Sequence, residues 1–343
     1  MLRAVLFKNH KRFDDFKTAL EESGVTVDVL DFADPDWWNY NFSEVDIVVY
    51  YPSFQFSSNH PQAVSHVRDN LGQLHQLYPH LVIYPEPNVY SFYNDKYTQY
   101  LFLSKTGFPV PQTIPLVSTR AVDEAVAKLG FPIVVKNRYG AGGDFVFRVE
   151  SERDIHNFFK LSQLDLLNEE FVVRSLRSLL KRETYYHLLK ARQAKYPLLS
   201  PPLIAQEFLT IQRDLKLVVV DGEVVEGHWR LPANEAMWKV NIDGGGVGVW
   251  SHIPTEALNI GVELAERLEA RSLNIDLILQ EDGFLISEFS PVWHHYRYKE
   301  KESFRYESDY NLPMPLLEAL DLERLLVKSL VGAVEEKREL SNT

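Results

Sequence analysis

Apolar and polar segments alternate along the first 93 residues in a way that predicts a layered α/β domain. The apolar runs are short and rich in β-branched and aromatic residues, which is typical of buried strands. The strand candidates are 2–8, 25–32, 45–51 and 81–84, and the helix candidates between them are 11–23 and 61–77. Strands that alternate with helices favour an open, mostly parallel sheet, and such sheets bind ligands at the strand ends, here near 8–10 and 51–53.

The pattern changes after residue 93, where helices and hairpins mix. Helices are predicted at 94–106, 119–129, 151–198, 255–271 and 315–337, and strands at 131–136, 145–149, 203–208, 215–220 and 223–230. We therefore expect the α/β class, with α+β character in the later part. The predicted division is an N-terminal α/β domain over 1–93, a smaller domain over 94–205 and a C-terminal domain over 206–343.

The segment 275–290 contains a candidate site. Its Asp282-Gly283 pair separates two apolar runs and predicts a β-hairpin. With the loop centred on Asp282, Asp276 and Glu288 lie opposite each other, and Ser290 lies on the face of Glu288. Opposed residues bring their Cβ atoms within about 5 Å, where two carboxylates repel. A hard divalent cation such as Mg²⁺ would remove the repulsion. The alternative is an edge hairpin with two solvated carboxylates.

The segment 136–144 places a lysine directly before a glycine-rich loop between two predicted strands. Lys136 ends the first strand, and Gly140, Gly142 and Gly143 follow. Backbone N–H groups in such a loop can cradle phosphate oxygens. The alternative is a hairpin whose glycines serve only the turn.

Composition narrows the classes of function. The chain has 343 residues, no cysteine and a net charge of −12. It therefore forms no disulfides, and no basic excess is available for general nucleic-acid binding. No run reaches the length of about 18 apolar residues that spans a membrane, and the apolar run at the N-terminus is too short for a secretory signal, so we expect a cytoplasmic location.

Three further features have a packing or solvation explanation beside a functional one. The aromatic cluster 37–42 is interpreted as packing rather than a recognition surface. The basic run 174–195 is interpreted as a solvated helix face, with a substrate or partner surface as the alternative. His294 and His295 are interpreted as loop histidines rather than substrate ligands.

In their order along the chain, these segments resemble the ATP-grasp superfamily, closest to its RimK-type and glutathione-synthetase-like ligases. The similarity covers about 94–290 and is carried by 95–97 with 107–113 (DKY…GFPVPQT), 132–144 (PIVVKNRYGAGGD), 206–209 (QEFL), 214–216 (DLK), 239–241 with 245–246 (KVN…GG) and 276 with 288–290 (D…EFS). The chain departs from the family at Lys216 and Lys239, which stand in place of arginine, and at Ser290, which replaces the usual asparagine.

The resemblance implies an ATP-grasp fold preceded by an N-terminal pre-ATP-grasp domain, with ATP and Mg²⁺ as cofactors and Mn²⁺ as an alternative ion. The implied nucleotide-binding residues are Lys96, Lys136, Gly140, Gly142, Gly143, Gln206, Glu207, Phe208 and Asp214. The implied catalytic residues, which stabilise charge on the transferred phosphoryl group, are Arg230, Lys239 and Asn241. The implied metal ligands are Asp276, Glu288 and Ser290.

The activity that follows is ATP-dependent joining of a carboxylate to an amine through an acyl phosphate. A kinase on the same fold and a non-catalytic nucleotide-binding module are the competing hypotheses. The expected partners are small-molecule or peptide carboxylates and amines, without nucleic acid or membrane, and a homo-oligomer is left open. We expect the insertion at 160–200 and the loop at 294–311 to set specificity, with Arg297, Tyr298 and Lys299 meeting an anionic substrate.

Overall fold

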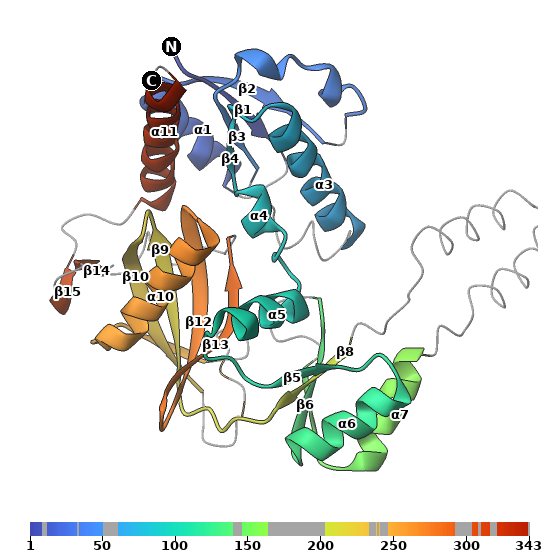
Figure 1. Cartoon of the computed structure of the whole chain (residues 1–343). Helices are drawn as coiled ribbons and strands as arrows, with labels where there is room; N and C mark the ends of the chain where they lie inside the picture. The colour runs from blue at the N-terminus through green and yellow to red at the C-terminus, as the bar shows by residue number, and fades with distance from the viewer. Residues whose placement is uncertain are drawn as a thin grey trace, which may run out of the picture. The chain divides into compact units, whose positions relative to one another are not determined.

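The computed structural model of the chain describes residues 1–8, 12–32, 34–50, 61–139, 146–163, 203–232, 238, 240, 246–291, 304–307, 310–315 and 321–341. These residues form two compact units (Figure 1). The first unit combines residues 1–94 with 211–343, and the second comprises 95–210. The three-domain division expected from the sequence stays a prediction.

The first unit begins with a parallel four-stranded sheet, which confirms the predicted open α/β layer. Its strands are β1 (Arg3–Phe7), β2 (Thr26–Leu30), β3 (Ile47–Val49) and β4 (Val82–Tyr84), in the order β2-β1-β3-β4. The helices that alternate with them are α1 (Phe13–Glu22), α3 (Pro61–Leu77) and α4 (Pro87–Tyr90), with short 3-10 turns η1 (Trp37–Asn39) and η2 (Phe42–Glu44). Trp37 is buried against Phe7 and Phe32, which confirms packing for that member of the aromatic cluster.

The C-terminal helix α11 (Leu322–Ser341) returns to this N-terminal layer and lies beside α1 (Figure 1). Leu322 and Leu326 belong to the same buried cluster as the strands β1 and β3. A buried ion pair between Arg12 and Glu323 joins the two helices. The predicted helix 315–337 is wrong at its start, because Pro315 ends a strand and the helix begins at Leu322.

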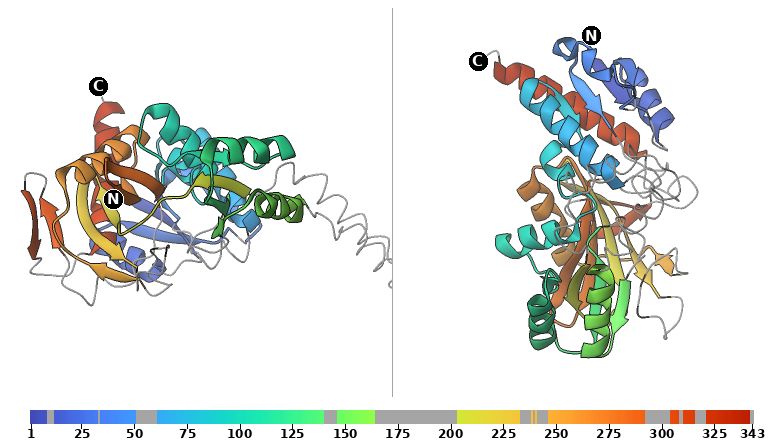
Figure 2. Two further views of the ribbon diagram at one scale, coloured as in Figure 1. Left: turned by 90° about the horizontal axis from the view of Figure 1, so that it is seen from below. Right: turned by 90° about the vertical axis from the view of Figure 1, so that its right-hand side faces the viewer.

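The second sheet of this unit is antiparallel and five-stranded. Its strands are β9 (Asp214–Val220), β10 (Glu223–Leu231), β11 (Val247–Val249), β12 (Ser272–Gln280) and β13 (Gly283–Ser290), in the order β11-β10-β9-β12-β13. Helix α10 (Thr255–Leu268) packs across one face (Figures 1 and 2). Gly261 lets the helix approach closely, since a Cβ there would lie 3.2 Å from Leu217 Cδ1.

A separate hairpin of β14 (Phe304–Glu307) and β15 (Tyr310–Pro315) falls partly within the segment 294–311, which was expected to be a loop. These strands are not predictable from the sequence pattern, because the segment is rich in charged and aromatic residues without regular alternation.

Two Asp-Gly pairs in the five-stranded sheet behave differently. Asp221 and Gly222 form the turn itself, and both adopt positive φ as a two-residue hairpin turn requires. In the second hairpin the turn is Glu281-Asp282, because Gln280 pairs with Gly283. The expectation that this loop is centred on Asp282 is therefore wrong.

A β-bulge corrects the register of the second hairpin. Leu277 pairs with Ile286, whereas Asp276 pairs with Glu288, so Ser287 is an extra residue on β13. The extra residue moves Glu288 onto the face of Asp276. The predicted pairing of Asp276 with Glu288 is confirmed, although the turn alone would not produce it.

The second unit contains an antiparallel four-stranded sheet in the order β5-β8-β6-β7. Its strands are β5 (Thr113–Pro115), β6 (Ile133–Asn137), β7 (Val146–Val149) and β8 (Leu203–Glu207), and its helices are α5 (Lys96–Thr106), α6 (Thr119–Leu129) and α7 (Glu152–Gln163). A buried cluster joins α6 and α7 to one sheet face through residues such as Val122, Ile155 and Val135. Beyond Gln163, the predicted helix 151–198 lies outside the described residues.

No helix in the part of the chain that the structure describes combines the length and the apolar character needed to cross a bilayer.

Candidate functional site

Charged and polar side chains gather on the face of the five-stranded sheet opposite α10. Alternation along the strands separates the faces: Leu217 and Ile275 point to α10, so Lys216 and Asp276 point away from it. One row of directly paired residues crosses four strands and contains His228, Lys216, Asp276 and Glu288. The neighbouring row begins with Arg230 on β10 and Asp214 on β9.

Ion pairs link four of these residues into one network. Arg230 binds Asp214 through two hydrogen bonds of 2.7 Å, from Nε to Oδ1 and from Nη2 to Oδ2. The Nη2 group also donates to Asp276 Oδ2 at 3.0 Å. Lys216 Nζ donates to Asp276 Oδ1 at 3.1 Å. Two cations thus offset two carboxylates, and Glu288 adds a further negative charge beside Asp276.

Burial raises the pKa of both Asp214 and Asp276, and the neighbouring cations lower it, but the balance differs between the two residues. Burial would raise the pKa of Asp276, but the charges of Arg230 and Lys216 outweigh it and hold that pKa well below its usual range. For Asp214, burial dominates and raises the pKa despite the neighbouring Arg230. Asp276 therefore stays ionised and able to ligate a cation, whereas Asp214 mainly fixes the guanidinium of Arg230.

The three predicted metal ligands lie on one face of two neighbouring strands. Asp276 faces Glu288, and Ser290 follows two residues later on β13. All three offer oxygen, which suits a hard divalent cation. Lys216 and Arg230 each use one site on an Asp276 oxygen, and a carboxylate has about four such sites, so capacity for a metal remains. The donor set therefore fits Mg²⁺.

Lys136 and Gln206 come together on the second unit. They lie on the antiparallel strands β6 and β8, and Lys136 Nζ donates to the side-chain oxygen of Gln206. Gln206 Nε2 in turn donates to Thr113 Oγ1 at 3.0 Å. The next residue, Glu207, accepts a 2.7 Å hydrogen bond from the Gln112 backbone N–H. Phe208 packs against the guanidinium of Arg148, 4.5 Å from the ring centre.

Lys96 is the first residue of α5, and an ion pair fixes the backbone around it. Asp95 caps the helix by accepting from Tyr97 N and Thr98 N. Arg138 binds the same carboxylate through Nε and Nη2, at 2.7 and 2.6 Å. The Lys96 N–H donates to the Arg138 carbonyl at 3.1 Å, so the start of α5 is joined to the end of β6.

Several predicted residues lie outside the described residues. These are the glycines Gly140, Gly142 and Gly143, the predicted catalytic Lys239 and Asn241, the histidines His294 and His295, and the loop residues Arg297, Tyr298 and Lys299. The strand ends at 9–10 and 51–53 and the basic run 174–195 lie there as well.

The sequence reading missed three polar interactions around the site. It named Lys216 only as a departure from arginine, because Lys216 and Asp276 pair across β9 and β12, which are not consecutive along the chain. It also missed the ion pair of Arg138 with Asp95, which no local motif signals. Finally, it missed Glu226, which is fully buried with its carboxylate 3.5 Å from Nδ1 of His228.

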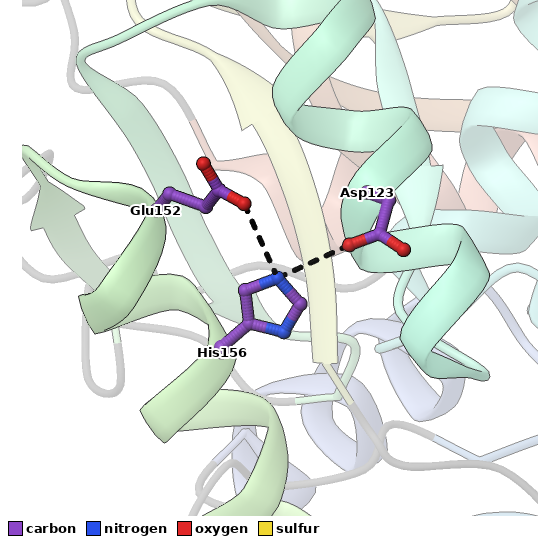
Figure 3. Close-up of side chains that lie close together, drawn as sticks. All are labelled: Asp123, Glu152 and His156. Atoms are coloured by element: carbon purple, nitrogen blue, oxygen red, sulfur yellow. Dashed lines mark ion pairs between the residues drawn. The ribbon is translucent and has the colours of Figure 1, made fainter.

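A separate group of metal-capable side chains in the second unit is explained by ion pairs. His156 Nε2 on α7 lies 3.1 Å from Asp123 Oδ1 on α6 and 3.9 Å from Glu152 Oε1 (Figure 3). Asp123 and Glu152 are mostly exposed. We interpret this group as a link between the two helices.

Comparison with known proteins is consistent with this distribution of residues. Residues 181–294 match the family model described as a RimK-like ATP-grasp domain, and residues 93–194 match the one described as an ATP-grasp domain. Among curated proteins, the alpha-aminoadipate–LysW ligase LysX of Sulfurisphaera tokodaii is 24% identical over 258 residues, which cover 74% of this chain and 75% of the relative.

A second curated relative from the same organism, the glutamate–LysW ligase ArgX, is 22% identical over 304 residues, which cover 88% of this chain and 90% of the relative. Among solved structures, an ATP-grasp RimK domain protein from Sphaerobacter thermophilus superposes with a TM-score of 0.58 at 12% identity. That match covers 96% of this chain and 100% of the other.

Proposed function

Because this chain belongs to the ATP-grasp superfamily, we propose that it is an ATP-dependent ligase that joins a carboxylate to an amine through an acyl phosphate. Membership confirms the resemblance drawn from the sequence motifs, and ATP is the nucleotide that the family binds. The observation that carries the proposal is the charge network of Arg230, Asp214, Lys216 and Asp276 with Glu288 beside it.

The network suits a reaction in which a negatively charged triphosphate binds and its terminal phosphoryl group is transferred. A triphosphate brings several negative charges, which attract the Lys216 and Arg230 side chains that now bind Asp276. As these cations turn toward phosphate or carboxylate oxygens, Asp276 gains capacity for a metal. Asp214 keeps the Arg230 guanidinium oriented throughout, because it holds Nε and Nη2 together.

Asp276, Glu288 and Ser290 would hold Mg²⁺, or Mn²⁺ in its place. The ion would supply charge neutralisation of the phosphates during phosphoryl transfer. Arg230 is then a direct partner of the transferred group and stabilises the charge that develops on it.

The second unit supplies contacts of a different kind. Lys136 turns from Gln206 to a phosphate oxygen, and Lys96 acts as a further point charge toward phosphate. The backbone of 206–208 would bind the adenine edge, as the resemblance of this segment to the hinge of ATP-grasp ligases implies. Lys239, Asn241 and the glycines 140, 142 and 143 complete the proposed set.

The names of the two curated relatives guide the choice of substrates. One is named for joining alpha-aminoadipate to LysW, and the other for joining glutamate to LysW. We therefore include acidic amino acids as amine donors, and both peptides and small molecules as carboxylates.

The test is a screen of carboxylate and amine pairs with the full chain, ATP and Mg²⁺. ADP and phosphate are quantified, and products are identified by mass spectrometry. We expect an amide-linked product together with ADP and free phosphate, and no turnover when either substrate is omitted.

Two results would point elsewhere. A stable phosphoester with ADP and no free phosphate identifies a kinase. ATP binding without turnover across the library identifies a binding module. Arg230→Gln serves as the matched variant, because it removes the charge but keeps hydrogen-bonding capacity, and it should lower kcat by at least about 100-fold.

A further inference from the structure

Asn274 lies on the same sheet face as the proposed metal ligands, and the proposed function assigns it no role. It precedes Asp276 by two residues on β12, and it pairs directly with Ser290 on β13. Its side chain is only 6% exposed. Its Oδ1 atom has no hydrogen-bond partner among the residues that the structure describes.

The neighbours of Asn274 do not satisfy this oxygen. Val218 lies beside it on β9 and is apolar. Ser272, two residues earlier on the same face, shares a 2.8 Å hydrogen bond with the Tyr84 hydroxyl. A buried amide oxygen without a partner is uncommon in native proteins and indicates a bound ion or water.

We propose that Asn274 Oδ1 is a ligand of the divalent cation that Asp276 and Glu288 hold. An amide oxygen is a stronger ligand for a hard cation than the short hydroxyl of Ser290. Paired residues on neighbouring strands have Cβ atoms within about 5.5 Å, so Asn274 can reach an ion beside Ser290. This inference rests on the metal site of the proposed function.

The test measures Mn²⁺ affinity of the full chain by electron paramagnetic resonance, with ADP present, and measures urea denaturation in parallel. Asn274→Leu keeps the number and branching of the side-chain heavy atoms and removes the amide. We expect Asn274→Leu to weaken Mn²⁺ binding at least about tenfold. Stability without metal should be unchanged or higher, because the substitution removes a buried polar group that has no hydrogen-bond partner.

A transfer variant makes the test specific. Asn274→Leu combined with Ser290→Asn places the amide on the neighbouring strand and should recover most of the Mn²⁺ affinity. Ser272→Ala is the matched control, since it removes a buried polar group from the same strand face and should lower stability without changing Mn²⁺ affinity.

The outcomes separate this inference from the proposed function. If Asp276→Asn abolishes Mn²⁺ binding but Asn274→Leu leaves it unchanged and lowers stability, Asn274 is structural and the inference is wrong. If Asp276→Asn and Glu288→Gln also leave Mn²⁺ binding unchanged, the metal site itself is wrong.

Discussion

At the scale of single residues, the guanidinium of Arg230 holds the site together. Its side chain is 13% exposed and binds Asp214 and Asp276, which are themselves mostly buried. Burial lowers the pKa of an arginine, but the two carboxylates more than offset this and keep the pKa of Arg230 above its usual value. The charge of Arg230 is therefore permanent.

Replacing Arg230 should destabilise the fold as well as stop turnover. Arg230→Ala leaves two buried carboxylates without their shared cation, which costs roughly 3 kcal/mol. Urea denaturation would measure the loss. Arg213→Ala is the control, because Arg213 is exposed and stacks on Trp229 at 4.0 Å, a contact worth about 1 kcal/mol. Equal losses for the two variants would contradict this account.

Glu86 should make stability depend on pH. Burial raises the pKa of Glu86 from 4.5 to about 7, even though Arg271 N donates to its Oε1 at 3.2 Å. The folded state keeps a proton that the unfolded chain releases, so stability is full below pH 4.5 and falls as pH rises to about 7.

Glu86→Gln should remove this dependence. The variant and the natural protein should unfold at the same urea concentration near pH 4.5, whereas at pH 8 the variant should be more stable by up to about 3 kcal/mol. A variant that is less stable at pH 8 would show that the carboxylate is ionised and paired with Arg271.

At the scale of elements, the ion pair of Asp95 and Arg138 connects α5 to β6, the two elements that carry Lys96 and Lys136. Arg138→Ala should raise the KM for ATP about tenfold or more, because Lys96 loses its position. Steady-state kinetics would measure the change. Arg120→Ala on the exposed side of α6 is the control and should leave KM unchanged.

Two variants of Asp95 separate capping from charge. Asp95→Asn removes the charge that pairs with Arg138 and should raise the KM for ATP. Stability should change little, because asparagine is also a good N-cap. Asp95→Ala removes the cap as well and should cost about 1 kcal/mol of stability in addition. If both variants leave KM unchanged, the ion pair has no part in positioning Lys96.

The strands that carry the site were largely predictable from the sequence. The register of the hairpin formed by β12 and β13 was only partly predictable. Asp-Gly located the turn to within a residue, and period-two alternation located the strands. Alternation also carried a sign of the bulge: Phe284 and Ile286 are buried two residues apart, but the next buried residue is Phe289, three residues on. The pairing of Lys216 with Asp276 was harder to predict, because strand order within the sheet is set by long-range packing.

At the scale of the whole molecule, the two ends of the chain stabilise one layer. Glu323 on α11 pairs with Arg12, and both side chains are at most 8% exposed. Glu323→Ala should lower the free energy of unfolding by roughly 3 kcal/mol, because it removes the carboxylate from a buried guanidinium. Chemical denaturation followed by tryptophan fluorescence would measure the effect, since Trp37 lies in this core.

Arg324→Ala, which breaks the exposed pair with Glu22, is the control and should cost less than about 1 kcal/mol. If Glu323→Ala is no more harmful than this control, α11 does not depend on the buried pair. The sequence could not predict this contact, because 311 positions separate Arg12 from Glu323 and no periodicity links them.

The extra residue at Ser287 has a consequence for how this chain tolerates insertions and deletions. The turn at Glu281-Asp282 is at the sheet surface, where changes of length are usually absorbed. Between Phe284 and Glu288 the two kinds of change differ. One inserted residue would turn Glu288 toward α10 and remove a carboxylate from the site, whereas deleting Ser287 would remove the bulge and leave Glu288 opposite Asp276. Functional variants of this chain should therefore tolerate the loss of the bulge residue but not an added residue in this five-residue segment.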